Sequence, residues 1–201
     1  MSGLPEDDRR RWNRRYAAGR GPRQEPDPFL VASRPWLLPA TDCGGPGGPR
    51  PRRALDLASG PGGNSLWLAG EGWRVEALDI SDVALERLLA EASRRGLDGR
   101  VAARRVDLRL WRLPHDQEAG YDLALMTWYL ERRLLGEMRR AVRPGGLVLV
   151  RTFLRGTRRP LPPDWILEPG ELGRAFAGWT TLRMREATAL GEAAYLGRRP
   201  C

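Results

Sequence analysis

The chain has 201 residues, of which 41% are hydrophobic and 29% are charged, as expected for one soluble globular domain with a sizeable core. It contains no run of about 18 apolar residues, which excludes a membrane-spanning helix. Its first residues lack the basic and apolar regions of a secretory signal. Cys43 and Cys201 make neither a disulfide framework nor a metal site. We therefore expect a cytoplasmic protein that binds no metal.

The formal net charge of +9 is compatible with binding to a phosphate backbone. The chain has 34 arginines and no lysine, and the arginines are scattered along it in pairs and triplets. This distribution favours a solvated surface and makes nucleic acid an unfavoured partner. A face that binds RNA is the alternative.

The predicted elements begin with a helix at about residues 8–18, followed by a proline-rich segment with a short helix over the apolar islands 28–31 and 36–38. A Gly/Pro-rich loop at 42–49 comes next. Strands are then predicted at 54–57, 74–79, 101–106, 121–126, 147–152, 180–186 and 193–198, and helices at 63–70, 82–95, 130–142 and 169–176. This alternation predicts an α/β fold: a doubly wound, Rossmann-like and mostly parallel sheet of about seven strands with helices on both faces.

The most informative segment runs from Asp56 to Asn64, where a short apolar strand leads into a glycine-rich turn and then a helix. Gly60 and Gly62 have no Cβ, so the turn can be tight and its backbone can lie against a ligand. A second strand ends in Asp79, close to the offset of about 20 residues expected for an acid that binds ribose hydroxyls. Nucleotide-like ligands bind outside the carboxyl edge of such strands.

The spacing of the glycines distinguishes between ligands. A dinucleotide-binding turn carries three glycines as GxGxxG and presents helix amides to a pyrophosphate, whereas this turn reads D-x-A-x-G-x-G. An acid at the strand tip repels phosphate and suits a ligand with a cationic amino group, such as S-adenosyl-L-methionine (SAM). The missing third glycine disfavours a nicotinamide-dependent dehydrogenase.

The same segment resembles the opening motif LDLGCGxGxN of the class I SAM-dependent methyltransferases, with Ala58 and Ser59 replacing the first glycine and the cysteine. The resemblance implies that the turn holds the amino-acid part of SAM, that Asp79 binds the ribose and that Asp107 meets the adenine edge. It assigns to the cofactor site Arg15, Asp56, Ala58, Gly60, Gly62, Asn64, Asp79, Ile80, Asp107, Leu108 and Thr127. For Asp79 and Asp107, ordinary capping of strand ends is the alternative. The product would be S-adenosyl-L-homocysteine (SAH).

The N-terminal sequence from Trp12 to Tyr16 resembles the W-x-x-R-Y helix of small-molecule methyltransferases of the tellurite-resistance and thiol-methyltransferase kind. In that family the helix folds over the cofactor, which implies that Arg15 pairs with the SAM carboxylate and that Trp12 and Tyr16 wall the pocket. The alternative is an amphipathic helix with two aromatic core anchors. The expected single domain then consists of residues 1–50, a lid helix with a Pro/Gly-rich segment, and residues 51–201, a SAM-binding methyltransferase core.

Methyl transfer from SAM is an in-line displacement at an activated carbon, so positioning of the nucleophile supplies much of the catalysis. The only histidine, His115, lies away from the predicted strand ends, and no general base is evident. This favours a thiol, selenol or amine acceptor, with Trp12, Tyr16, Trp128 and Tyr129 around the substrate. We expect a small-molecule methyltransferase that is a monomer or homodimer. The alternatives are an RNA or protein methyltransferase and a SAM-binding protein without catalysis.

Overall fold

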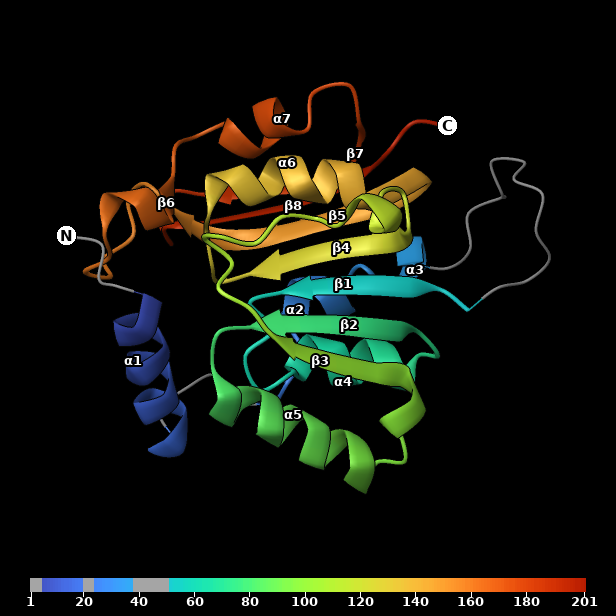
Figure 1. Cartoon of the computed structure of the whole chain (residues 1–201). Helices are drawn as coiled ribbons and strands as arrows, with labels where there is room; N and C mark the ends of the chain where they lie inside the picture. Colours follow the sequence, from blue (N-terminus) through green and yellow to red (C-terminus); the bar gives the residue numbers. More distant parts are fainter. Residues whose placement is uncertain (1–4, 20–23, 38–50) are drawn as a thin grey trace. The chain divides into compact units, whose positions relative to one another are not determined.

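The computed structural model of the chain describes residues 5–19, 24–37 and 51–201 (Figure 1). Its contacts divide the chain into two compact units. The first unit comprises Met1–Asp27 and Pro51–Trp111, and the second comprises Pro28–Arg50 and Arg112–Cys201. Each unit contains strands and helices of its own. The expected single domain, divided at residue 50 into a lid segment and a core, stays a prediction.

The first unit is built on three parallel strands in the order β3-β2-β1. Its elements are α1 (Pro5–Ala17), β1 (Arg53–Leu57), α4 (Gly63–Gly70), β2 (Arg74–Asp79), α5 (Asp82–Arg94), η1 (Asp98–Arg100) and β3 (Val101–Arg105). β1 is buried from Ala54 to Leu57, as expected for a strand covered on both faces. The helices α4 and α5 pack on these strands, and α1 packs on α5 (Figure 1).

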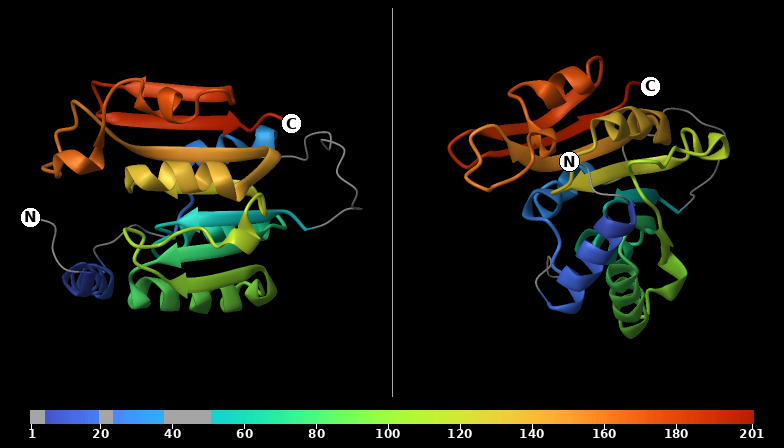
Figure 2. Two further views of the ribbon diagram at one scale, coloured as in Figure 1. Left: turned by 45° about the horizontal axis from the view of Figure 1, so that its top comes forward. Right: turned by 60° about the vertical axis from the view of Figure 1, so that its left-hand side comes forward.

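The second unit contains four strands in the order β4-β5-β8-β7, with the short β6 paired to β5. Its elements are α2 (Pro28–Val31), α3 (Arg34–Leu37), η2 (His115–Gln117), β4 (Tyr121–Thr127), α6 (Arg132–Ala141), β5 (Val142–Leu154), η3 (Pro163–Trp165), β6 (Ile166–Leu167), α7 (Glu171–Ala175), β7 (Thr180–Ala187) and β8 (Glu192–Arg198). β4 and β5 are parallel, and β8 lies antiparallel between β5 and β7, as Figure 2 shows. α6 packs on β4 and β5 and buries Leu134, Leu135 and Met138.

The α/β class with a mostly parallel sheet is confirmed, and six of the seven predicted strands start and end within a residue of their predicted bounds. The exception is β5, which starts already at Val142 instead of 147. Its Pro-Gly-Gly segment continues the strand, because Gly145 takes φ 75° and the pairing with β4 shifts register between Tyr121 and Leu123. The sequence Arg143-Pro-Gly-Gly predicted the end of a helix and a turn before the strand. It could not reveal that these residues form a bulge within the strand, which the shift in register shows.

Smaller differences concern the short elements. The predicted short helix around 28–38 is present as two four-residue helices, α2 and α3. The two-residue strand β6 was not predicted, because so short a segment shows no periodicity. The predicted Gly/Pro-rich loop at 42–49, which contains Cys43, lies outside the described residues. Among the described helices, none combines the length and the hydropathy needed to cross a membrane.

Candidate functional site

The glycine-rich turn joins β1 to α4 in the first unit. The amide of Ser59 donates a hydrogen bond to a carbonyl of β2 at 3.1 Å, so the turn lies beside the end of that strand. Gly60 (φ 53°) and Gly62 (φ 86°) both adopt the left-handed backbone region. A Cβ on Gly62 would come within 2.1 Å of Leu88 Cδ1, and a Cβ on Gly60 within 2.9 Å of Tyr16 Oη. The turn therefore requires glycine at position 62, whereas at position 60 its left-handed backbone favours glycine and a Cβ would meet the end of the Tyr16 side chain.

Ala58 stands where the resembling motif has its first glycine, and it too is left-handed, with φ 59°. This conformation costs a non-glycine residue about 1–2 kcal/mol. Ala58→Gly should therefore raise the free energy of unfolding by about 0.5–1 kcal/mol. This figure is the strain relieved minus the conformational entropy that glycine adds to the unfolded chain. Urea denaturation measures the change. The matched control Ala69→Gly, inside α4, should lower the free energy of unfolding by about 1 kcal/mol or more. A destabilising Ala58→Gly would show that Ala58 is not strained.

Asp56 is buried near the end of β1, with 1% of its surface exposed. Ser65 Oγ donates a hydrogen bond to Asp56 Oδ2 at 2.6 Å, whereas Asp56 Oδ1 is buried and has no partner among the described residues. Burial is the main cause that raises the pKa of Asp56 to about 7; the Ser65 hydrogen bond lowers it and the charge of Asp79 raises it. A buried oxygen without a partner costs free energy. Asp56 Oδ1 is therefore suited to receive a charged N–H donor from a ligand.

Asp79 ends β2 and is buried as well. Gly60 N donates to Asp79 Oδ2 at 2.8 Å and Ser81 N donates to Asp79 Oδ1 at 2.9 Å, so the carboxylate connects the glycine turn to the start of α5. Burial raises the pKa of Asp79, and the backbone hydrogen bonds from Ser81, Gly60 and Ile80 lower it. Asp79 therefore does cap the strand end, but three backbone hydrogen bonds leave the carboxylate with acceptor capacity for a ligand hydroxyl. The neighbouring Ile80 is half-buried.

The helix α1 lies against the glycine turn within the first unit. Ser81 Oγ donates to Asn13 Oδ1 at 2.6 Å, which fastens α1 to the start of α5. Tyr16 is 5% exposed, and its hydroxyl lies directly over Gly60. Burial raises the pKa of Tyr16, and the charge of Asp79 raises it further, so the phenol stays protonated. The helix α1 thus contacts the glycine turn through Tyr16. That this helix folds over a cofactor stays a prediction.

Three residues of the W-x-x-R-Y motif form one stack. The rings of Trp12 and Tyr16 have centroids 5.8 Å apart and an interplanar angle of 27°. Arg15 is exposed, and its guanidinium carbon lies 5.4 Å from the centre of the Trp12 ring. The pairing of Arg15 with a ligand carboxylate stays a prediction.

Asp107 and Leu108 follow β3, where they were expected. Asp107 accepts hydrogen bonds from Arg109 N at 3.0 Å, Arg109 Nε at 3.2 Å and Arg109 Nη2 at 3.1 Å. Arg109 Nη1 also pairs with Asp8 Oδ2 in α1 at 2.8 Å. Leu108 is buried. Asp107 thus binds the Arg109 guanidinium, which also pairs with Asp8 in α1. This role of Arg109 was not predicted, although Arg109 follows Asp107 by only two positions.

Asn64 and Ser65 occupy the first turn of α4. Asn64 Oδ1 accepts a hydrogen bond from Asp27 N at 2.8 Å, so this predicted cofactor residue holds the segment 24–27 against the turn. Ser65 was not among the predicted site residues, although it orients Asp56. A hydroxyl in the first turn of a helix that follows a strand acid is a signal that could have revealed it.

The predicted residues Thr127, Trp128 and Tyr129 lie at the end of β4 in the second unit. Trp128 has φ 58°, a conformation that costs a bulky residue roughly 1–3 kcal/mol and that clusters at ligand sites. Its amide donates to Arg151 O at 2.7 Å, and the Arg151 guanidinium lies 4.6 Å from the centre of its ring. The ring of Tyr129 lies 6.3 Å from that of Trp165.

His115 lies in η2, where its side chain is 97% exposed and its Nδ1 is 3.2 Å from Glu118 Oε1. The prediction that it is a surface residue is confirmed. The chain contains no second histidine.

Residues 54–146 match a family described as a methyltransferase domain. Over 107 residues the chain is 30% identical to ribosomal RNA small subunit methyltransferase C of Alcanivorax borkumensis, an alignment that covers 49% of this chain and 31% of the relative. The chain spans between 31% and 57% of the length of the curated relatives it matches, about half on average.

Two solved structures show the same fold at low sequence identity. TehB from Haemophilus influenzae superposes with a TM-score of 0.69 and 18% identity, covering 92% of this chain and 66% of that protein. A geranyl diphosphate C-methyltransferase from Streptomyces coelicolor A3(2), in complex with Mg²⁺, geranyl diphosphate and SAH, gives a TM-score of 0.70 and 16% identity, with 99% and 98% coverage. The expected resemblance in fold is confirmed.

Proposed function

We propose that this chain, whose residues 54–146 match a family described as a methyltransferase domain, is a class I SAM-dependent enzyme that transfers a methyl group from SAM to a small-molecule acceptor. The observation that carries the proposal is a pair of buried carboxylates at neighbouring strand ends. Asp56 has an oxygen without a partner, and Asp79 holds the glycine turn. The cofactor is SAM and the product is SAH, the compound present in the similar Streptomyces enzyme.

The two carboxylates suit different parts of SAM. Asp56 Oδ1 would receive the ammonium group, because a charged donor satisfies a buried oxygen that has no other partner. Asp79 would accept hydrogen bonds from the ribose hydroxyls. The Tyr16 hydroxyl lies against Gly60 in the turn. The other residues proposed for the cofactor site are Arg15, Ala58, Gly62, Asn64, Ile80, Asp107, Leu108 and Thr127.

SAM should bind more tightly as the pH rises from about 5.5 to 7. With a pKa raised to about 7, Asp56 is protonated below that pH in the unliganded chain, and an ammonium group beside it requires the ionised form. Binding below pH 7 therefore releases a proton, and the affinity should rise by up to about tenfold per pH unit before it levels off. Calorimetric titration at several pH values measures this slope. Asp56→Asn should bind more weakly with a flat profile; a flat profile in the unaltered chain would contradict the pairing.

The same pKa has a consequence for the unliganded fold. The folded chain holds the proton of Asp56 up to about pH 7, whereas an unfolded chain releases it near the ordinary aspartate pKa of 3.8. Protonated Asp56 therefore contributes to the free energy of unfolding at low pH, and this contribution is lost as the pH rises from about 4 through 7. The cofactor should restore it, because it favours the ionised carboxylate.

The acceptor is proposed to be a thiol, a selenol or an amine. SAM, when bound, supplies a methyl group on a positively charged sulfur, and the residues of the chain position the acceptor and exclude water. The exposed His115 and the protonated phenol of Tyr16 offer no base near neutral pH. A thiol or selenol ionises with little help, unlike an alcohol. The residues proposed to bind the substrate are Trp12, Tyr16, Trp128 and Tyr129.

An RNA methyltransferase is the second candidate, favoured by the net charge of +9 and by the similarity to a ribosomal RNA methyltransferase. Calorimetry with SAM, followed by measurement of SAH release, separates the candidates. Release with small thiols, selenols or amines supports the proposal. Release only with unmodified RNA or with protein would replace it, and SAM binding without release from any acceptor would identify a non-catalytic binding protein. A cytoplasmic location and a monomeric or homodimeric state stay predictions.

A further inference from the structure

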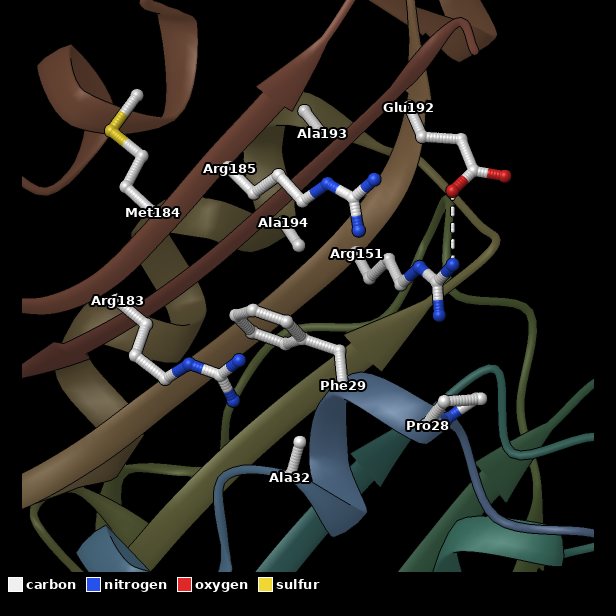
Figure 3. A pocket seen from close by; sticks show the side chains of 10 residues that line it. All are labelled: Pro28, Phe29, Ala32, Arg151, Arg183, Met184, Arg185, Glu192, Ala193 and Ala194. Atoms are coloured by element: carbon white, nitrogen blue, oxygen red, sulfur yellow. Dashed lines mark hydrogen bonds and ion pairs between the residues drawn. The ribbon is translucent and has the colours of Figure 1, made fainter.

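The second unit contains a pocket of about 250 Å³ that the glycine turn and its carboxylates do not explain. It lies over the strands β5, β8 and β7 and is bordered by α2, as Figure 3 shows. Its charged lining comes from Arg151 on β5, Glu192 on β8, and Arg183 and Arg185 on β7. None of these four residues was predicted from the sequence to belong to a site.

The strand register explains why these arginines share one face. Arg151 pairs with Ala194 on β8, and Ala194 pairs with Arg185 on β7, so the three side chains stand in a row. Arg183 lies two residues before Arg185 and therefore on the same face. The outer members of the row are two strand spacings, or about 10 Å, apart. Between them the methyl group of Ala194 leaves a hollow that two guanidinium groups border (Figure 3).

The pocket carries uncompensated positive charge. Its three guanidinium groups face a single carboxylate, since Arg151 Nη2 pairs with Glu192 Oε2 at 2.9 Å, and this leaves a net charge of +2. Arg185 makes no hydrogen bond or ion pair with any described residue, and its pairing capacity is unused. Like charges gathered in a concavity attract an anion and raise its local concentration.

Arg183 is held in place by its surroundings. Its Nη1 donates to Ser33 Oγ at 3.1 Å, and its guanidinium carbon lies 4.6 Å from the centre of the Phe29 ring and 5.3 Å from that of Trp36. A guanidinium fixed by aromatic faces loses less side-chain entropy when it binds an oxyanion. The pocket thus combines one pre-oriented cation with one that is free to pair.

We propose that this pocket binds the oxyanion group, carboxylate or phosphate, of a small molecule. Arg185 and Arg183 receive the anion, and Arg151 connects the pocket to the strained Trp128, on whose ring it stacks. The anion site is argued within the second unit alone, so it does not rest on the proposed function.

Calorimetric titration of the full chain without SAM tests the site. The probes are orthophosphate, pyrophosphate, succinate and citrate, with neutral succinamide as the uncharged counterpart of succinate. We expect at least one anion to bind and succinamide not to bind. Tighter binding of the phosphates than of succinate and citrate would identify a phosphate ligand, and the reverse order a carboxylate ligand. Arg185→Gln should weaken binding about tenfold or more, the effect of losing a charge-assisted hydrogen bond. The matched control Arg87→Gln removes an exposed charge from α5 and should leave the affinity unchanged.

A second variant separates shape from charge. Ala194→Leu retains all three arginines but fills the hollow, so it should abolish binding if the anion enters the pocket. Binding that is unaffected by both Arg185→Gln and Ala194→Leu, or no binding of any anion, would overturn the proposal. Tighter, Arg185-dependent binding of an RNA oligonucleotide would also overturn it. A separate titration with SAM keeps a failure of the methyltransferase assignment distinguishable from a failure of this site.

Discussion

Asp79→Ala should weaken SAM binding by about 1–3 kcal/mol, or roughly 5- to 150-fold in Kd, as measured by calorimetric titration. Two losses contribute to this effect. The ribose hydroxyls lose a charged acceptor, and the amides of Gly60 and Ser81 lose the carboxylate that connects the turn to α5. Because Asp79 is buried, the hydrogen bonds it would make are not screened by water.

Two further variants separate the loss of the ribose contact from a general loss of structure. Asp79→Asn keeps the size and one acceptor oxygen, so it should fall between the unaltered chain and Asp79→Ala. Asp98→Ala removes an exposed carboxylate from η1 in the same unit and should bind SAM normally. If thermal melts show Asp79→Ala to be folded and its SAM affinity is unchanged, Asp79 does not bind the ribose and serves only as a cap.

The candidate site could be predicted from the sequence where short-range patterns determine it. A strand, a glycine-rich turn and a helix follow one another within a few residues, so Asp56, Gly60 and Gly62 could be placed without knowledge of the fold. Asp79 could be placed because parallel strands end at the same edge of a sheet. The structure brings these residues together through the hydrogen bonds from Gly60 and Ser65.

Contacts between distant segments could not be predicted in this way. Arg109 bridges Asp107 and Asp8, which are far apart in the sequence, and nothing local reveals that bridge. The alignment of Arg151 with Arg185 across Ala194 depends on the register of three strands. Register is set by pairing across the sheet and not by the composition of any one strand. The alternation of Arg183 and Arg185 on one strand was visible, but not that Arg151 lies across from them.

The glycine turn, the segment 24–27 and α5 form one connected structure. Gln24 Nε2 donates to Pro61 O and to Arg87 O at 3.1 Å each. Together with the hydrogen bond from Asp27 N to Asn64, these contacts hold the extended segment over the start of α4. The backbone of this segment approaches α4 so closely that no side chain fits between them at Gly63. This close approach makes Gly63 a sensitive position for the whole candidate site.

Gly63→Ala should lower the free energy of unfolding by about 2–3 kcal/mol and weaken SAM binding together with it. A Cβ at residue 63 would lie 2.2 Å from Glu25 O, and a backbone atom cannot give way as the end of a side chain does. Gly70→Ala is the matched control at the other end of α4. No atom lies within 4 Å of a Cβ there, so alanine should raise the free energy of unfolding by about 0.5–1 kcal/mol. Urea denaturation measures both variants; equal effects of the same sign would mean that the segment 24–27 does not press on α4.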